Sequence, residues 1–294
     1  MGFMHQHDAR IGSLMAVASM ACVQLGLACA VLLIDRVGAE GTAWLRLVFA
    51  AVIFLVIARP KPSSFTARTF GACVLLGVVT AGITVLFMVA VSHIALGTAS
   101  ALEFLGPLTV AVAAGSGRRR LVWPALAAAG VVLLTEPWTG SVNLVGVGFA
   151  LAAAVCWGSY IVLTQRVGDA VAGIDGLAVS MPVAGLVATI VVGPSMFTRL
   201  TPDLILIGIG LAILLPVIPF ILELQALRRL TAAAFGTLMS LEPAFAMLVG
   251  LIVLGQVPGP LAILGIALVV VAGVGAARSG ARTDEATVPA AAGA

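Results

Sequence analysis

Two stretches of the chain repeat one pattern: residues 92–112 read SHIALGTASALEFLGPLTVAV and residues 228–249 read RRLTAAAFGTLMSLEPAFAMLV. Each begins with a polar or basic turn, continues with small residues, and then places a glutamate close to a proline in an apolar segment. Glu103 and Pro107 belong to the first copy, Glu242 and Pro243 to the second. A carboxylate in hydrocarbon costs about 2.5–3.5 kcal/mol on insertion scales, so it is rare without a function. The repeated pattern therefore predicts a duplicated membrane protein with a transport site.

The composition is typical of an integral membrane protein. Hydrophobic residues make up 62% of the chain, charged residues 9%, and the mean hydropathy is +1.21. Soluble domains carry roughly 25% charged residues. The net charge of +3 does not predict a nucleic-acid partner, because the basic residues lie in short loops. The four cysteines lie in apolar runs without metal-ligand spacing, so we expect neither a metal, nor a cofactor, nor a disulfide.

Apolar segments long enough to span a bilayer, which takes about 20 residues, recur along the chain. We expect an all-α integral membrane protein with ten transmembrane helices, at about residues 11–34, 41–58, 70–91, 95–114, 121–135, 144–164, 173–194, 204–222, 231–254 and 259–277. They divide into a first five-helix repeat, residues 1–140, and a second, residues 141–277. The remaining residues, 278–294, are expected to form a disordered cytoplasmic tail.

The basic residues predict the orientation of these helices, because cytoplasmic loops are enriched in lysine and arginine. With both termini in the cytoplasm, the inner loops and ends contain twelve basic residues: Arg10, Arg59, Lys61, Arg68, Arg118, Arg119, Arg120, Arg166, Arg228, Arg229, Arg278 and Arg282. The outer loops contain Arg36 and Arg199. Five helices per half would insert the two halves in opposite directions, which is the inverted repeat of many secondary transporters. The alternative is that the duplication is a relic in a scaffold or subunit.

The two glutamates are expected near the middle of the membrane. Glu103 lies about nine residues into the fourth span and Glu242 about eleven into the ninth, which is roughly 13–17 Å at 1.5 Å per residue. A carboxyl group at this depth could bind substrate or exchange a proton during transport. Alternatively, it could be a protonated, hydrogen-bonded group that only holds helices together.

Prolines are expected to interrupt several spans. Pro107 removes the donor that would bond the carbonyl of Glu103, and Pro243, Pro216 and Pro219 each release a carbonyl in the same way. Unbonded carbonyls at membrane depth must face protein, water or ligand. These helices could therefore line a cavity, although ordinary kinks that improve packing are the alternative.

A few further residues are candidates for the site. Arg46, in the second span, could reach the outer interface, or it could face the cavity and bind a carboxylate or pair with a glutamate. Trp157 and Tyr160 are three residues apart, so they share a helix face and could line a pocket or simply pack. Gln24 is a weaker polar candidate. Glu223 is expected to form an ion pair at the interface with the two arginines that follow it.

At these residues the chain resembles a known family. The segment PFILELQALRRLTAAAFGTLMSLEPAFAMLVGLIVLG, residues 219–255, resembles the EamA branch of the drug/metabolite transporter superfamily. Within that branch, ALEFLGPLTVAV, FGTLMSLEPA and LELQALRRL are similar to the threonine and homoserine exporter subgroup, and WLRLVFAA (44–51) and CWGSYIVLTQR (156–166) agree. The resemblance covers almost the whole chain apart from the two ends.

The resemblance implies a ten-helix carrier of the bacterial inner membrane that exports small amino-acid-like metabolites, with protons as the coupling ion. It places the two glutamate–proline pairs on the family's paired motifs and Arg46 on its helix-two arginine. One difference stands out: relatives usually have Leu-Gly-Glu after the ninth helix, where this chain has Leu-Gly-Gln, ending at Gln256. That acid could take part in proton coupling in relatives, or it could be a structural cap that glutamine partly replaces.

We expect export of neutral amino acids such as threonine or homoserine; the alternative within the same fold is a cationic drug or another metabolite. An enzyme is not expected, because the chain has three histidines and none of the catalytic motifs of intramembrane enzymes. A non-transporting subunit is a further alternative. The chain has no phosphate-binding loop for ATP. The faces of small residues are compatible with a monomer or a homodimer.

Overall fold

The computed structural model describes residues 2–58, 65–114, 121–136, 138, 143–170, 175–192, 195–227, 229–230 and 232–279. All regular elements in these ranges are helices, and no strand occurs among them, which confirms the all-α prediction. Six helical segments are long and apolar enough to cross a membrane: Arg10–Ile57, Ala67–Val91, Leu144–Thr164, Asp175–Val192, Pro202–Glu223 and Thr237–Leu254. Two shorter apolar helices cover Val122–Thr135 and Pro260–Ala276. The chain is therefore a multi-pass membrane protein.

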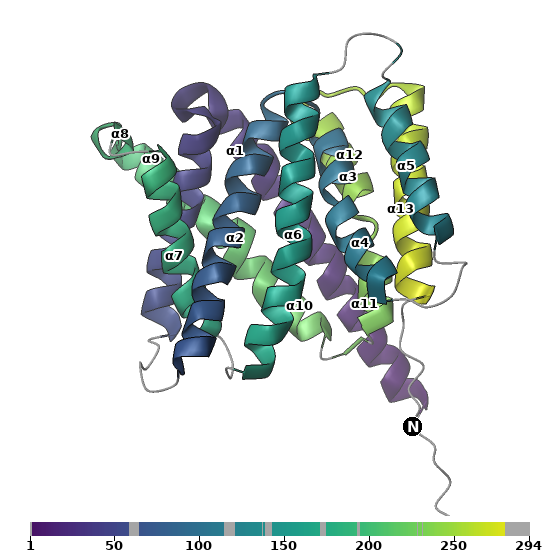
Figure 1. Ribbon diagram of the computed structural model, residues 1–294, viewed down its shortest axis with the longest axis horizontal. Coiled ribbons are helices and arrows are strands. Elements are labelled where there is room, and N and C mark those ends of the chain that lie inside the picture. The colour runs from purple at the N-terminus through teal and green to yellow at the C-terminus, as the bar shows by residue number, and fades with distance from the viewer. Residues whose placement is uncertain are drawn as a thin grey trace, which may run out of the picture.

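The first helix, α1 (Gly2–Ala58), contains the first two expected spans. It is broken at Gly38, whose φ of 79° and ψ of 168° are not helical. A positive φ is readily adopted only by glycine. Thr42 Oγ1 donates a hydrogen bond to the carbonyl of Gly38 at 2.8 Å. Figure 1 shows that α1 runs from the N-terminal end of the bundle to the opposite end and then turns back, so it forms two antiparallel segments.

The other helices follow in chain order. They are α2 (Ala67–Val91), α3 (Leu96–Glu103), α4 (Leu105–Ala114), α5 (Val122–Thr135), α6 (Leu144–Ala170), α7 (Asp175–Val192), α8 (Ser195–Thr198), α9 (Pro202–Ala212), the π-helical turn η4 (Ile213–Val217), α10 (Ile218–Leu227), α11 (Ala232–Met239), α12 (Glu242–Leu254) and α13 (Pro260–Ser279). The last helix continues two residues past the expected boundary at 277. The rest of the expected disordered tail, residues 280–294, lies outside the described residues.

Three expected spans are interrupted near their prolines, as the sequence predicts. The fourth is divided into α3 and α4 at Phe104, and the ninth into α11 and α12 at residues 240–241. The eighth passes through η4, which contains Pro216. Short π-helical turns inside α-helices are frequent at functional sites.

The helices pack in pairs that join the two halves of the chain. The segments of α1 pack against α7, α9 and α10, and α2 packs against α6 and α7. At the opposite side of the bundle α5 runs alongside α13, and α3 contacts α12 (Figure 1). Small residues allow these approaches: a Cβ atom on Gly130 or on Gly265 would lie 2.7 Å from the carbonyl oxygen of the other glycine. Close backbone contact of this kind is the usual basis of helix association in membranes.

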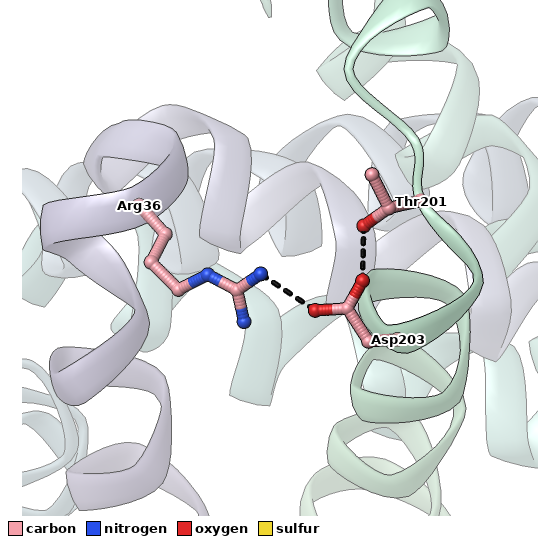
Figure 2. Close-up of polar contacts among 3 residues, drawn as sticks. All are labelled: Arg36, Thr201 and Asp203. Atoms are coloured by element: carbon pink, nitrogen blue, oxygen red, sulfur yellow. Dashed lines mark hydrogen bonds and ion pairs between the residues drawn. The ribbon is translucent and has the colours of Figure 1, made fainter.

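An ion pair connects the reversal of α1 to the beginning of α9 (Figure 2). Arg36 Nη2 lies 2.6 Å from Asp203 Oδ2, and the other carboxylate oxygen accepts a hydrogen bond from the hydroxyl of Thr201. Both charged side chains are about half exposed, at 49% and 54%. The pair therefore links the first and second halves at the end of the bundle that lies opposite the N-terminus.

Candidate functional site

The two glutamates of the repeated motif come together at helix interruptions. Glu103 is the last residue of α3 and Glu242 is the first residue of α12. These two helices pack against each other, and the two carboxyl groups are close enough to interact electrostatically. Glu103 is buried, with 8% of its surface exposed. The fold thus joins two residues that are far apart in the sequence and belong to different halves.

Gln24, on the first segment of α1, holds the carboxyl group of Glu242. Its Nε2 donates a hydrogen bond to Glu242 Oε1 at 3.2 Å, and Gln24 is completely buried. Gln24 Oε1 and Glu242 Oε2 are also buried, and neither has a hydrogen-bond partner among the described residues. Buried polar atoms are nearly always paired, with protein or with water. The two oxygens can be satisfied by a proton on the carboxyl group of Glu242 or by a donor group of a bound molecule.

Arg46 faces the interior of the bundle, not the outer interface. Its Nη2 donates a hydrogen bond to Thr84 Oγ1 of α2 at 3.1 Å, and Thr84 is 3% exposed. Arg46 also interacts electrostatically with Glu103. Opposite charges attract strongly where water is excluded. Arg46 thus belongs to the same cluster as the glutamates.

The prolines occupy the interruptions beside this cluster. Pro107 is the third residue of α4 and Pro243 the second residue of α12. Pro216 lies within η4, and the carbonyl of the buried Pro219 accepts a hydrogen bond from Ser19 Oγ at 3.4 Å. Pro107 and Pro243 thus adjoin the two glutamates, whereas Pro216 and Pro219 lie in the eighth expected span, where Pro219 contacts Ser19.

The two aromatic candidates on α6 have different neighbours. Trp157 packs edge-on against Phe104, the residue after Glu103, with ring centroids 6.2 Å apart. Tyr160 packs against the apolar cluster that contains Cys73 of α2, and it interacts electrostatically with Glu223. Trp157 thus borders the glutamate cluster, while Tyr160 packs in the apolar cluster around Cys73.

Of the two arginines expected to pair with Glu223, Arg229 forms no ion pair with it. Glu223 Oε1 accepts a hydrogen bond from the fully buried Ser19 at 2.9 Å, and Glu223 makes no ion pair within the described part of the chain. Arg229 Nη1 instead donates to the side chain and to the carbonyl of Gln225, both at 2.9 Å, because the carbonyls at the end of α10 need donors. Arg228 lies outside the described residues. Ser19 and Thr84 are contacts that the sequence did not single out, although an isolated hydroxyl in an apolar span is a signal for them.

Gln256 caps a helix of the other half. Its Oε1 accepts a hydrogen bond from the backbone N–H of Leu96, the first residue of α3, at 3.0 Å. The first four N–H groups of a helix have no partner within the helix, so this contact satisfies one of them. Of the two roles considered for this position, the structure shows that of a cap. Among the described residues, no group of three or more potential metal ligands exists.

Comparison with known proteins identifies the family. The sequence profile of the EamA-like transporter family matches residues 144–276. The chain is similar to threonine/homoserine exporter RhtA of Escherichia coli (strain K12), with 33% identity over 266 residues and 88% of each protein covered. The protein of the same name from Salmonella typhimurium (strain LT2) is 32% identical over 269 residues, which cover 89% of this chain and 90% of that protein.

A solved crystal structure shares the fold, with a TM-score of 0.60 and 18% identity, over 92% of this chain and 98% of the other. The similarity to the exporters extends over nearly the entire chain and includes both halves of the glutamate cluster. The chain therefore belongs to the EamA-like transporter family, in the subgroup that resembles the threonine/homoserine exporters, and it is a membrane transporter and not an enzyme.

Proposed function

We propose that this protein is a secondary transporter of the bacterial inner membrane that exports small amino-acid-like metabolites of the threonine and homoserine class. The observation that carries the proposal is the cluster of Glu103, Glu242, Gln24 and Arg46, which combines two carboxylates, unpaired acceptors and a guanidinium inside an apolar bundle. The relatives named as threonine/homoserine exporters support the choice of cargo.

The cluster suits a zwitterion. An alkylammonium group has three N–H donors, and Gln24 Oε1 and Glu242 Oε2 are buried acceptors without partners. A guanidinium has five donors, and the hydrogen bond of Arg46 to Thr84 leaves others for a carboxylate. Protons are the proposed coupling ion, because a carboxyl group that meets substrate in one state can take up a proton in the other.

The proposed architecture is ten transmembrane helices in a 5+5 inverted repeat, with residues 1–140 and 141–277 as the two units. Two pairs of segments support this register: LIDRVG (33–38) with LTQRVG (163–168), and GTASALE (97–103) with GTLMSLE (236–242). The packing of the helices supports this register too. The third span, α2, contacts the sixth span, α6, and the equivalent eighth span, α9 to α10, contacts the first span, at the beginning of α1. The contacts α1–α7, α3–α12 and α5–α13 each pair equivalent helices.

Alternating access would then consist of a rocking of one unit against the other. The cluster lies between the units, since Gln24 and Arg46 come from the first and Glu242 from the second. The proposed orientation has both termini in the cytoplasm, and the excess of basic residues in the expected inner loops supports it.

The test is uptake of radiolabelled homoserine and threonine into inside-out membrane vesicles, with and without a proton gradient. We expect accumulation driven by the gradient in the wild type and its loss in Glu103→Gln. Glu40→Gln is the matched control, because Glu40 is an exposed carboxylate at the reversal of α1. Good expression without accumulation of either amino acid would reject this cargo, and accumulation independent of the gradient would reject proton coupling.

A cationic cargo is the second candidate, favoured by the excess of carboxylates over arginine in the cluster. Trp157 borders the cluster and could stack on a cation. Arg46→Ala separates the two candidates. If the wild type transports amino acids and the variant does not, the zwitterionic cargo is supported. If the wild type transports no amino acid, and both proteins transport an organic cation, the cationic cargo is supported.

A further inference from the structure

The two copies of the repeated motif have acquired different surroundings. When LIDRVG (33–38) is aligned with LTQRVG (163–168), Gln24 corresponds to Ala154. The helix equivalent to the second segment of α1 is α7, whose sequence DGLAVSMPVAGLVATIVV contains no lysine or arginine, so Arg46 has no equivalent in the second half. Each of the two polar neighbours of the glutamates thus exists in only one copy.

This difference gives each glutamate its own partner. Glu103 interacts electrostatically with Arg46, and its carboxyl group accepts no hydrogen bond from the described residues. Glu242 accepts its hydrogen bond from Gln24, and neither glutamate lies within ion-pair distance of a basic side chain in the described part of the chain. Arg46 is therefore the basic neighbour of Glu103, whereas the polar contact of Glu242 is the amide group of Gln24.

At Glu242, two buried acceptor oxygens without a described partner lie on side chains that contact each other. On α3 the buried Ser100 Oγ also has no described partner, but a hydroxyl group can donate as well as accept. Because the amide nitrogen of Gln24 donates to one carboxylate oxygen, its own oxygen is left as an acceptor beside the second carboxylate oxygen. The opposite amide orientation would place two acceptors against each other, so the hydrogen-bond chemistry sets this assignment. The missing component is a donor, preferably a cation.

We propose that Gln24 and Glu242 form the binding site for the ammonium group of the substrate, and that Glu103 is a positioning residue that holds Arg46 for the carboxylate. The inference rests on the proposed function for the presence of both charged groups on one substrate. It adds that the two glutamates of the repeat have different roles, because Glu242 touches the substrate and Glu103 acts through Arg46.

The test uses purified full-length protein and competition against radiolabelled homoserine by two analogues. The analogue 3-aminopropan-1-ol keeps the ammonium group and lacks the carboxylate, whereas 4-hydroxybutanoate keeps the carboxylate and lacks the ammonium group. We expect Glu242→Gln to weaken homoserine and 3-aminopropan-1-ol by about tenfold or more, because a charge-assisted hydrogen bond is lost, and to leave 4-hydroxybutanoate unchanged. Glu103→Gln should weaken homoserine and 4-hydroxybutanoate and leave 3-aminopropan-1-ol unchanged.

Two further variants keep the test decisive. Gln24→Leu preserves all charges and should reproduce the pattern of Glu242→Gln in a weaker form. Glu40→Gln should bind all three compounds like the wild type. Size-exclusion chromatography shows which variants are folded, and Gln24→Leu substitutes for Glu242→Gln if the latter is not.

The possible outcomes separate the inference from the proposed function. An identical pattern for Glu103→Gln and Glu242→Gln, or an exchanged pattern, overturns the division of roles. A wild type that binds 3-aminopropan-1-ol but not homoserine refutes the amino-acid cargo and still allows the ammonium site to be tested with that amine by direct binding. A wild type that binds no ammonium compound overturns the inference.

Discussion

Replacing Gly106 with alanine should separate two helices that position Glu103. A Cβ atom at Gly106 of α4 would lie 2.1 Å from the carbonyl oxygen of Ala154 and 3.0 Å from the backbone nitrogen of Gly158, both on α6. Ordinary contact begins at 3.4 Å, so the two backbones must move apart by about 1.3 Å. Backbone atoms cannot rotate away as a side chain can, and overpacking of this kind costs about 1–3 kcal/mol.

The control is the same substitution on a neighbouring surface. Gly148 of α6 has no atom within 4 Å of its added Cβ, so alanine there should stabilise the protein by up to about 1 kcal/mol through helix propensity. We expect Gly106→Ala to lower the midpoint of thermal unfolding in detergent and to reduce vesicle uptake by about tenfold, because Glu103 lies one helical turn away. Gly148→Ala should leave uptake unchanged. If Gly106→Ala were as stable and as active as Gly148→Ala, the close contact of α4 with α6 would be refuted.

Three other predictions concern contacts that link the two halves. Gln256→Ala should lower the stability by about 1 kcal/mol, because the cap on α3 is lost, whereas Gln256→Glu should keep both the cap and transport. If the two variants lowered the stability equally, the capping role would be contradicted. Arg36→Asp should lower the unfolding temperature at low ionic strength, and the double variant Arg36→Asp with Asp203→Arg should restore it. If the single variant still unfolds at a lower temperature than the wild type in about 1 M salt, where charges are screened within roughly 3 Å, this would argue against an ion pair. Trp44 Nε1 donates to Thr189 Oγ1 at 2.8 Å, so the cost of Trp44→Phe should be smaller by about 0.5–1.5 kcal/mol in a Thr189→Val background than in the wild type. The remaining cost comes from the cavity left by the buried indole ring.

Hydropathy, rare charges and prolines were sufficient to predict that this protein lies in a membrane, that it is helical, and which residues form its candidate site. Hydropathy adds up along the chain, so the apolar spans can be recognised without knowledge of their neighbours. The cost of a carboxylate in hydrocarbon singles out Glu103 and Glu242, and the missing N–H groups of the prolines predict the interruptions between α3 and α4 and between α11 and α12.

Which polar residues meet depended on the packing of the helices in three dimensions. Gln24 contacts Glu242 across 218 positions of sequence, and Gln256 caps a helix 160 positions away. Glu223 forms no ion pair with Arg229, which is near it in the sequence, and accepts a hydrogen bond from Ser19, which is 204 positions away. In water, the apolar side of a helix shows which face is buried; in a bilayer, lipid and protein interior are equally apolar, so the chain carries no such mark. Hydropathy therefore could not predict that Arg46 points toward Thr84 and Glu103, because this orientation depends on how the helices pack.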